Sequence, residues 1–168
     1  KVMMDQNCPD ALQENTSKSL EESIKLFEKW DGKDKGRLRY IFTPRFAPSC
    51  SEEILEEIGH FVTKNNAYAQ THLSENKGEI KEVRKIFPDY RSYTEIYANA
   101  GLIGSNVIMA HSIYLDEEEI KILKRSDTKI AHCPYSNRNL KSGIMPYFHL
   151  KDKGLKIGLG SDISGGLS

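Results

Sequence analysis

Asn106-Val107-Ile108-Met109-Ala110-His111 is a short apolar run of strand-forming residues that ends in a histidine, and it decides the fold class. A helical pattern lies before this run at residues 94–100, and another helix starts after it at Asp116. A buried strand between two helices is the repeating unit of parallel α/β proteins. We therefore expect an α/β fold.

The alternation of strands and helices continues on both sides of this run. Further apolar stretches predict strands at residues 1–5, 38–46, 68–73, 129–133 and 156–159. Amphipathic stretches predict helices at residues 17–30, 51–64 and 77–87, with a weaker pattern at 144–153. Six strands joined through helices pair in parallel, either in an open doubly wound sheet or in a barrel. Periodicity alone does not choose between the two.

The composition argues against two classes of partner. The 168 residues include 24 Lys and Arg and 24 Asp and Glu, so the formal net charge is zero and no basic field attracts a phosphate backbone or an anionic membrane. No apolar run approaches the roughly 18 residues that span a bilayer. We expect no nucleic acid and no membrane among the partners.

The three cysteines, Cys8, Cys50 and Cys133, are odd in number and far apart. The sequence contains no C-x-x-C pair, so neither a disulfide framework nor a cysteine zinc site is indicated. Free thiols are typical of a reducing compartment, and we expect a cytoplasmic protein.

Polar side chains follow several of the predicted strands at the point where each strand ends. Arg45, His72, His111, His132 and Asp162 all stand at or near such C-terminal ends. In parallel α/β folds the loops at this edge converge over the barrel mouth or the sheet crevice, and functional sites are built there. The sequence therefore predicts a site on this rim.

His72, His111 and Asp162 have donor atoms that suit a metal ion. Taken singly, each has an ordinary interpretation, because a lone histidine after a strand is most often structural and Asp162 also fits a helix N-cap. Two imidazoles and a carboxylate from three strand ends together suit zinc or iron. Glu75 lies three residues after His72, where a turn returns its carboxylate to the same pocket. We therefore favour a metal site with an acidic neighbour.

His132 and Cys133 raise the alternative of a nucleophilic pair. Neighbours within a strand point to opposite faces, which argues against contact between the two side chains. We expect a structural role for Cys133 and a structural or site-lining role for His132. His60 and His149 fall within helical patterns and are interpreted as ordinary helix-face residues.

The candidate site residues lie in five motifs whose order runs through nearly the whole chain. The motifs are T-P-R-F at 43–46, T-H-L-S-E-N at 71–76, M-A-H-S at 109–112, A-H-C-P-Y-S-N-x-x-L-x-S-G at 131–143 and G-L-G-S-D at 158–162. In this order they resemble the guanine deaminase family of the amidohydrolase superfamily. The strand-end histidines, H-x-x-E and G-S-D mark the wider superfamily of metal-dependent deaminases and chlorohydrolases, whereas T-P-R-F with H-x-S-E-N points to guanine.

The resemblance implies roles for the metal-binding and acid–base residues. His72 and His111 are expected to be metal ligands for Zn²⁺, with Fe²⁺ as the alternative. Asp162 is expected to be a further ligand that also takes a proton from the attacking water. Glu75 is expected to be the proton shuttle that protonates a ring nitrogen and then the departing amine.

The resemblance also implies how a purine binds. Arg45 offers a planar fork of donors that fits a carbonyl or a ring nitrogen, and Phe46 packs against the ring. His72, Glu75 and Asp162 are expected to face the same substrate. The expected reaction is the hydrolytic deamination of guanine to xanthine and ammonia, in purine catabolism or salvage, by a homodimeric enzyme.

The family forms complete (β/α)8 barrels with a small β domain, and this sequence lacks part of that pattern. The H-x-H pair that the family carries after its first barrel strand does not occur in the 168 residues. The six predicted strands match the third to the eighth of the barrel. We expect residues 1–168 to form one partial barrel domain, with the other barrel units, the small β domain and two further histidine ligands outside it. We also expect the isolated chain to be inactive.

Two other functions are alternatives to guanine deamination. One keeps the chemistry and changes the substrate to another aminopurine, a pterin or a triazine. The other is a non-catalytic barrel relative that binds a ligand and needs no metal. Glu75 beside His72, together with Asp162, argues against the binding protein, because such a module has no evident need of a proton shuttle.

Overall fold

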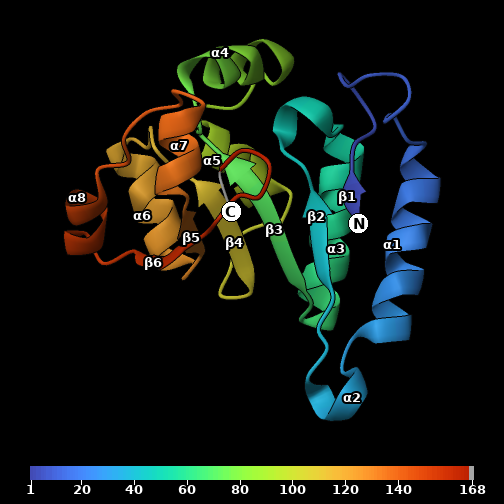
Figure 1. Cartoon of the computed structure of the whole chain (residues 1–168). Coiled ribbons are helices and arrows are strands. Elements are labelled where there is room, and N and C mark those ends of the chain that lie inside the picture. The colour runs from blue at the N-terminus through green and yellow to red at the C-terminus, as the bar shows by residue number, and fades with distance from the viewer. Residues whose placement is uncertain (167–168) are drawn as a thin grey trace.

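The computed structural model describes residues 1–166, whose centre is a sheet of six parallel strands (Figure 1). The strands are β1 (Val2–Met3), β2 (Ile41–Pro44), β3 (Tyr68–Leu73), β4 (Val107–His111), β5 (Lys129–His132) and β6 (Lys156–Leu159). Each strand pairs in parallel with the next, so strand order in the sheet equals strand order in the chain. An open doubly wound sheet reverses its order at a switch point. The α/β prediction is therefore confirmed, and the chain forms part of a TIM-type (β/α)8 barrel.

Helices connect the strands. They are α1 (Thr16–Trp30), α2 (Lys33–Gly36), η1 (Ala47–Ser49), α3 (Glu52–Asn65), α4 (Lys77–Ile86), α5 (Tyr93–Asn99), α6 (Glu117–Arg125), α7 (Pro134–Asn139) and α8 (Tyr147–Asp152). Each helix that the sequence predicts is present, and α8 is shorter than its predicted range. The sequence pattern did not predict α2, η1 or α7. Within residues 1–166 no helix has both the length and the apolarity to cross a bilayer.

Side-chain caps fix where the longer helices begin. The Ser51 hydroxyl accepts a hydrogen bond from the Ile54 amide at the start of α3. Asn76 and Glu79 form a capping box at the start of α4, in which each side chain accepts from the backbone of the other. Caps of this kind stabilise a helix by about 1 kcal/mol. They also fix the short loop between β3 and α4, which carries Glu75.

The two faces of the sheet have different surroundings. In β4, Val107 and Met109 are buried, whereas Ile108 and Ala110 between them are partly exposed. Ile108 and Ala110 line a cavity of about 270 Å³ on the barrel side of the sheet, together with His72. The outer face packs against the helices, and the barrel side opens toward the strand ends.

Candidate active site

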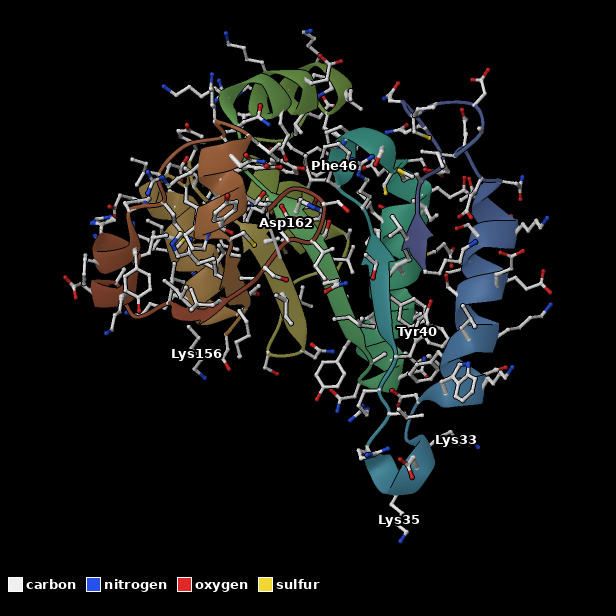
Figure 2. The ribbon with its side chains drawn as sticks, in the orientation of Figure 1. Lys33, Lys35, Tyr40, Phe46, Lys156 and Asp162 are labelled. Atoms are coloured by element: carbon white, nitrogen blue, oxygen red, sulfur yellow. The ribbon has the colours of Figure 1, made fainter. Side chains whose placement is uncertain are left out.

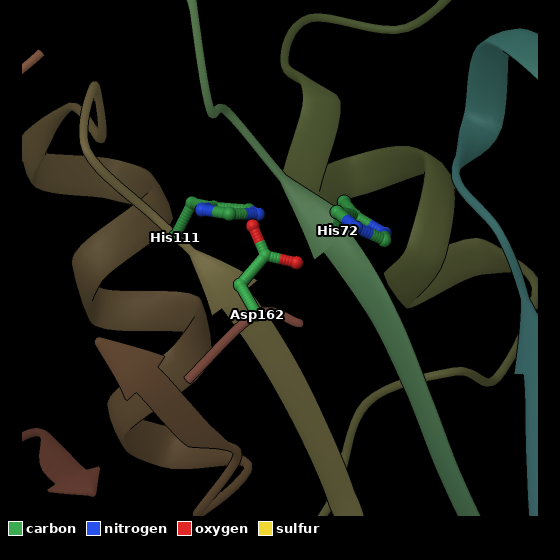
Figure 3. Close-up of side chains that lie close together, drawn as sticks. All are labelled: His72, His111 and Asp162. Atoms are coloured by element: carbon green, nitrogen blue, oxygen red, sulfur yellow. The ribbon is translucent and has the colours of Figure 1, made fainter. Parts of the chain in front are cut away.

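Three of the predicted site residues come together at the C-terminal ends of the strands. His72 is the second-last residue of β3, His111 is the last residue of β4, and Asp162 follows β6. One donor atom of each lies within 4.8 Å of the others, as Figure 3 shows. The two imidazole rings stack with their centroids 5.2 Å apart. The structure thus gathers the three side chains that the sequence proposed for a metal.

The backbone around this cluster adopts a conformation that is uncommon for residues with side chains. Ser74, His111, Ser112 and Asp162 all have φ between 49° and 67°. Such left-handed residues cost free energy and gather at functional sites, where the surrounding structure holds them. At His111 the left-handed backbone interrupts the regular alternation of side chains along β4. The imidazole ring therefore faces Asp162 (Figure 3).

His72 is held by the end of strand β2. Its Nδ1 lies 2.7 Å from the Arg45 carbonyl oxygen, and its backbone amide donates to the same oxygen at 3.2 Å. With the proton on Nδ1, the other ring nitrogen is free to bind a metal ion. Burial lowers the pKa of His72 below its usual value, which favours the neutral imidazole that metal binding requires.

His111 is fully enclosed and is oriented by an amide side chain. Its exposed fraction is 1%, and its Nδ1 lies 2.8 Å from the Asn137 Oδ1 atom. Because an amide oxygen only accepts hydrogen bonds, Nδ1 carries the proton of this hydrogen bond, and Nε2 faces the cluster. Asn137 lies in α7 and was not predicted as a site residue. It supports His111 in the way that carboxylates and carbonyls support metal-binding histidines.

Glu75 brings a carboxylate to the same cluster. Its Oε2 lies 3.7 Å from the His111 Nε2 atom, and its Oε1 accepts a hydrogen bond from the Ser142 hydroxyl at 2.8 Å. Its backbone amide donates to the buried Glu79 carboxylate at 2.8 Å. The turn after β3 therefore places Glu75 beside the cluster, as its position three residues after His72 predicted.

Asp162 faces the cluster and does not cap a helix. No helix begins after Asp162 within the described part of the chain, and its main-chain oxygen accepts from the Gly165 and Gly166 amides. The Ser136 hydroxyl donates to its Oδ2 atom. A Cβ on Gly165 would lie 2.5 Å from that oxygen, so the glycine gives the carboxylate its space.

Arg45 and Phe46 lie beside His72 at the same end of the sheet. The Phe46 ring centroid is 6.1 Å from that of His72, in an edge-on arrangement. The Arg45 guanidinium is exposed and lies 5.2 Å from the Phe46 ring centroid. Figure 2 shows Phe46 and Asp162 at one end of the sheet and Tyr40 toward the other. An aromatic ring and a planar cation thus border the site on the β2 side.

His132 lies apart from the metal-donor cluster, whereas Cys133 lines the same cavity as His72 and Asp162. The His132 ring stacks against Tyr147 at 6.1 Å, and burial lowers the pKa of this histidine. Cys133 follows β5 as the N-cap residue of α7 and is buried. Burial raises the pKa of its thiol to about 11, so the thiol stays protonated at neutral pH and is a poor nucleophile. His60 lies on α3 and His149 on α8, away from the strand ends.

The donor set fits a zinc or iron ion. Two imidazole nitrogens and one carboxylate oxygen are the ligand types of such sites, and here they converge from three strands. His72 and His111 each use one ring nitrogen to contact a protein oxygen, which leaves the other for a metal. These three residues leave coordination positions for further ligands and for water.

The sequence did not predict three supporting residues, which are Ser136, Asn137 and Ser142. They contact Asp162, His111 and Glu75 respectively, across 26 to 67 residues of chain. The one available signal was their place in the long motif at 131–143, directly after a strand end. Nothing in their spacing identifies the partner of each.

Comparison with known proteins gives consistent matches over the whole chain. The amidohydrolase family matches residues 1–168. Guanine deaminase of Dictyostelium discoideum is 40% identical over 166 residues, which make up 99% of this chain and 37% of that protein. The chain therefore spans little more than a third of the length of this curated relative.

Two solved structures superpose closely on the chain. Guanine deaminase from C. acetobutylicum, with guanine bound in its active site, is 42% identical with a TM-score of 0.95, over 99% of this chain and 40% of that one. The zinc complex of atrazine chlorohydrolase from Arthrobacter aurescens TC1 has a TM-score of 0.87 at 18% identity, over 98% of this chain and 37% of that one. The second likeness supports the barrel fold alone.

Proposed function

The chain belongs to the amidohydrolase family, and from this premise we propose that the protein hydrolyses guanine to xanthine and ammonia. The observation that carries the proposal is the Glu75 carboxylate, which lies 3.7 Å from His111 beside the cluster of metal-type donors. A carboxylate in this place serves proton transfer, whereas a module that only binds a ligand has no evident use for it.

Guanine is the favoured substrate because of the sequence relatives and the β2-side residues. The C. acetobutylicum relative, 42% identical, has guanine in its active site. The Arg45 guanidinium can donate two parallel hydrogen bonds to the purine carbonyl and a ring nitrogen. Phe46 supplies a flat apolar surface for the bicyclic ring.

The residues of this chain divide the proton transfers between them. Asp162 takes a proton from the attacking water, and Glu75 gives one to a ring nitrogen of guanine. Glu75 then receives the proton that Asp162 took and delivers it to the exocyclic nitrogen as the bond from C2 to that nitrogen breaks, so the nitrogen leaves as ammonia. The remaining proton of the new C2–OH group returns Glu75 to its starting protonation state. Water supplies the oxygen of xanthine and both protons, so the reaction balances without an oxidant or reductant.

The same proposal includes a metal ion held by His72, His111 and Asp162, with zinc favoured over iron. When bound, such an ion lowers the pKa of a water molecule toward 7, which makes a nucleophile available at neutral pH. Neutral histidine nitrogens and an ionised carboxylate suit zinc in such sites. The zinc content of the purified protein tests this choice.

We also propose the domain, the compartment and the oligomeric state in which the site works. Residues 1–168 work as one partial domain within a complete barrel, where further strands and two histidines of an H-x-H pair complete the site. Six consecutive parallel strands, of the eight that such a barrel needs, support this. We place the enzyme in the cytoplasm, in purine catabolism, as a homodimer; the three free cysteines support a reducing compartment.

The test is turnover of guanine by the zinc-loaded full-length protein. We expect guanine absorbance to fall while one ammonia appears for each guanine consumed. A pterin, a triazine and adenine are assayed in parallel under the same conditions. No turnover of guanine with turnover of another aminoheterocycle would transfer the proposal to that substrate, and a metal-free, inactive protein would favour a binding function.

A further inference from the structure

The hydroxyl group of Tyr97 in α5 is buried beside the site and contacts two neighbouring hydroxyls. The side chain is fully buried. Its oxygen accepts a hydrogen bond from the Ala47 amide at 2.9 Å and donates one to the His72 carbonyl at 2.9 Å. The Thr71 hydroxyl lies 3.1 Å away and the Tyr93 hydroxyl 3.4 Å away. A phenol has one donor and two acceptor positions, and these neighbours occupy all of them.

The partners of this hydroxyl belong to two segments that carry site residues. Ala47 directly follows Arg45 and Phe46, which border the site on the substrate side. His72 belongs to the metal-donor cluster. The regular pairing of β2 with β3 ends before either segment, at Phe42. Beyond that point, bonds to the Arg45 carbonyl and the Tyr97 hydroxyl hold the two strand ends together.

We propose that Tyr97 is a positioning residue, whose hydroxyl holds the Arg45–Phe46 segment at a fixed distance from His72. The inference deepens the proposed function and relies on it for the identity of the substrate. A substrate ring bound by one segment must meet a nucleophile generated at the other, and displacements of about 1 Å cost on the order of 100-fold in rate. One phenol bonded to both segments limits that displacement.

The test is the substitution Tyr97→Phe in the full-length protein, which removes the hydroxyl and keeps the ring. We expect kcat/KM for guanine to fall about 10- to 100-fold, as for other supporting groups around metal sites. The larger part should appear in kcat, because guanine still binds but its reacting carbon is displaced. Zinc content should stay at the wild-type level, since neither imidazole contact involves this hydroxyl.

A matched control is available in Tyr40, which also has a buried hydroxyl. That hydroxyl has no hydrogen-bond partner among residues 1–166, and Tyr40 lies toward the other end of the sheet from Phe46 and Asp162 (Figure 2). Tyr40→Phe should leave kcat and KM within about twofold of wild type. The comparison separates the loss of a buried hydroxyl from the loss of this particular connection.

A double-mutant cycle tests whether Tyr97 acts through the substrate segment. In an Arg45→Ala background the group that Tyr97 positions is gone, so Tyr97→Phe should cost much less than it costs in wild type. If Tyr97 only stabilised the fold, Tyr97→Phe would lower kcat/KM by the same factor in both backgrounds. If Tyr97→Phe does not fold, Thr71→Val replaces it, because the Thr71 hydroxyl contacts the Tyr97 hydroxyl and donates to the Arg45 carbonyl, and so belongs to the same connection between the two segments.

Amide hydrogen exchange gives a readout that needs no activity. Tyr97→Phe should speed exchange in residues 45–49, where the Ala47 amide loses its acceptor, and Tyr40→Phe should not. If wild type fails to turn over guanine, the proposed function falls and the exchange data still decide whether Tyr97 holds the segment. Unchanged exchange, or kcat/KM within twofold of wild type in an active enzyme, would overturn the inference.

Discussion

His111 has a left-handed backbone with a φ of 67° and a side chain that is 1% exposed. Its position at a strand end was enough to predict it as a candidate ligand. The amide of Asn137, 26 residues further along the chain, could not be predicted, because spacing does not reveal contacts between distant segments. At the residue scale, the sequence therefore indicated the residues of the candidate site, and the structure added the residues that hydrogen-bond to them.

Asn137→Ala should lower metal affinity and activity without removing a proposed metal ligand. His111 would lose the acceptor that fixes its ring, and such losses typically cost about 10- to 100-fold in metal affinity or activity. Zinc affinity by chelator competition and kcat/KM for guanine are the measurements. Asn139→Ala in the same helix is the control, since among residues 1–166 its exposed side-chain amide donates to the Gly165 carbonyl and not to His111. Equal behaviour of the two variants would contradict the role given to Asn137.

The buried Glu119 carboxyl makes the stability of the folded protein depend on pH, and the shift of its pKa fixes the direction of that dependence. Burial raises the pKa of this carboxyl above its usual value in the folded protein. The folded state then binds the proton more tightly than the unfolded state, so this group's stabilisation is complete at low pH and is lost as the pH rises through the folded pKa. Glu119→Gln should reduce that decline in a series of urea midpoints measured from about pH 4.5 to 8, and the rest remains because burial also raises the pKa of the Glu79 carboxyl. The exposed Glu118→Gln should keep the full decline, and an undiminished decline in Glu119→Gln would contradict the assignment.

At the scale of helices and strands, the elements with an apolar pattern were predicted, and α2, η1 and α7 were not. The buried strands and the amphipathic helices such as α3 follow from their apolar spacing. α7 has six residues, from Pro134 to Asn139, and a helix this short shows no clear helical period in the sequence. α2 contains left-handed residues at Asp34 and Lys35, which no periodicity encodes. Tertiary contacts decide such segments.

The packing of α3 against the end of α5 depends on Gly59. A Cβ at this position would lie 1.6 Å from the Ala100 carbonyl oxygen, which is backbone and cannot rotate away. Gly59→Ala should therefore destabilise the protein by about 3 kcal/mol or more, as measured by urea unfolding. Gly78→Ala in α4 is the control, because its nearest neighbour is the Asn76 side chain at 3.1 Å. That variant should change stability by less than about 1 kcal/mol.

At the scale of the whole molecule, the sheet of residues 1–166 has an unpaired strand edge on each side, at β1 and at β6. Within residues 1–166, β1 pairs only with β2 and β6 only with β5. Leu159 and Ile163, near the β6 edge, are 83% and 74% exposed. An unpaired strand with exposed apolar side chains is a site for association, which a closed barrel avoids. Periodicity predicted parallel strands but did not choose between a barrel and an open sheet. The motif resemblance predicted the partial barrel, and the strand order confirms it.

The isolated chain of residues 1–168 should lack guanine deaminase activity and should self-associate. Both expectations follow from the free edges and from the proposal that two ligands of an H-x-H pair lie elsewhere. Size-exclusion chromatography and an ammonia assay on the isolated chain are the measurements, with the full-length protein as the reference. A monomeric isolated chain with turnover comparable to the full-length protein would refute the partial-domain proposal.

The proton-transfer role proposed for Glu75 connects the geometry of the site to its chemistry, and one measurement tests it most directly. Ammonia release from guanine is followed with full-length wild type and Glu75→Gln at equal zinc content. The glutamine keeps the size of the side chain and loses proton transfer, so we predict a fall in kcat of about 100- to 10,000-fold with zinc retained. Guanine turnover by Glu75→Gln at a rate close to that of wild type would contradict the account.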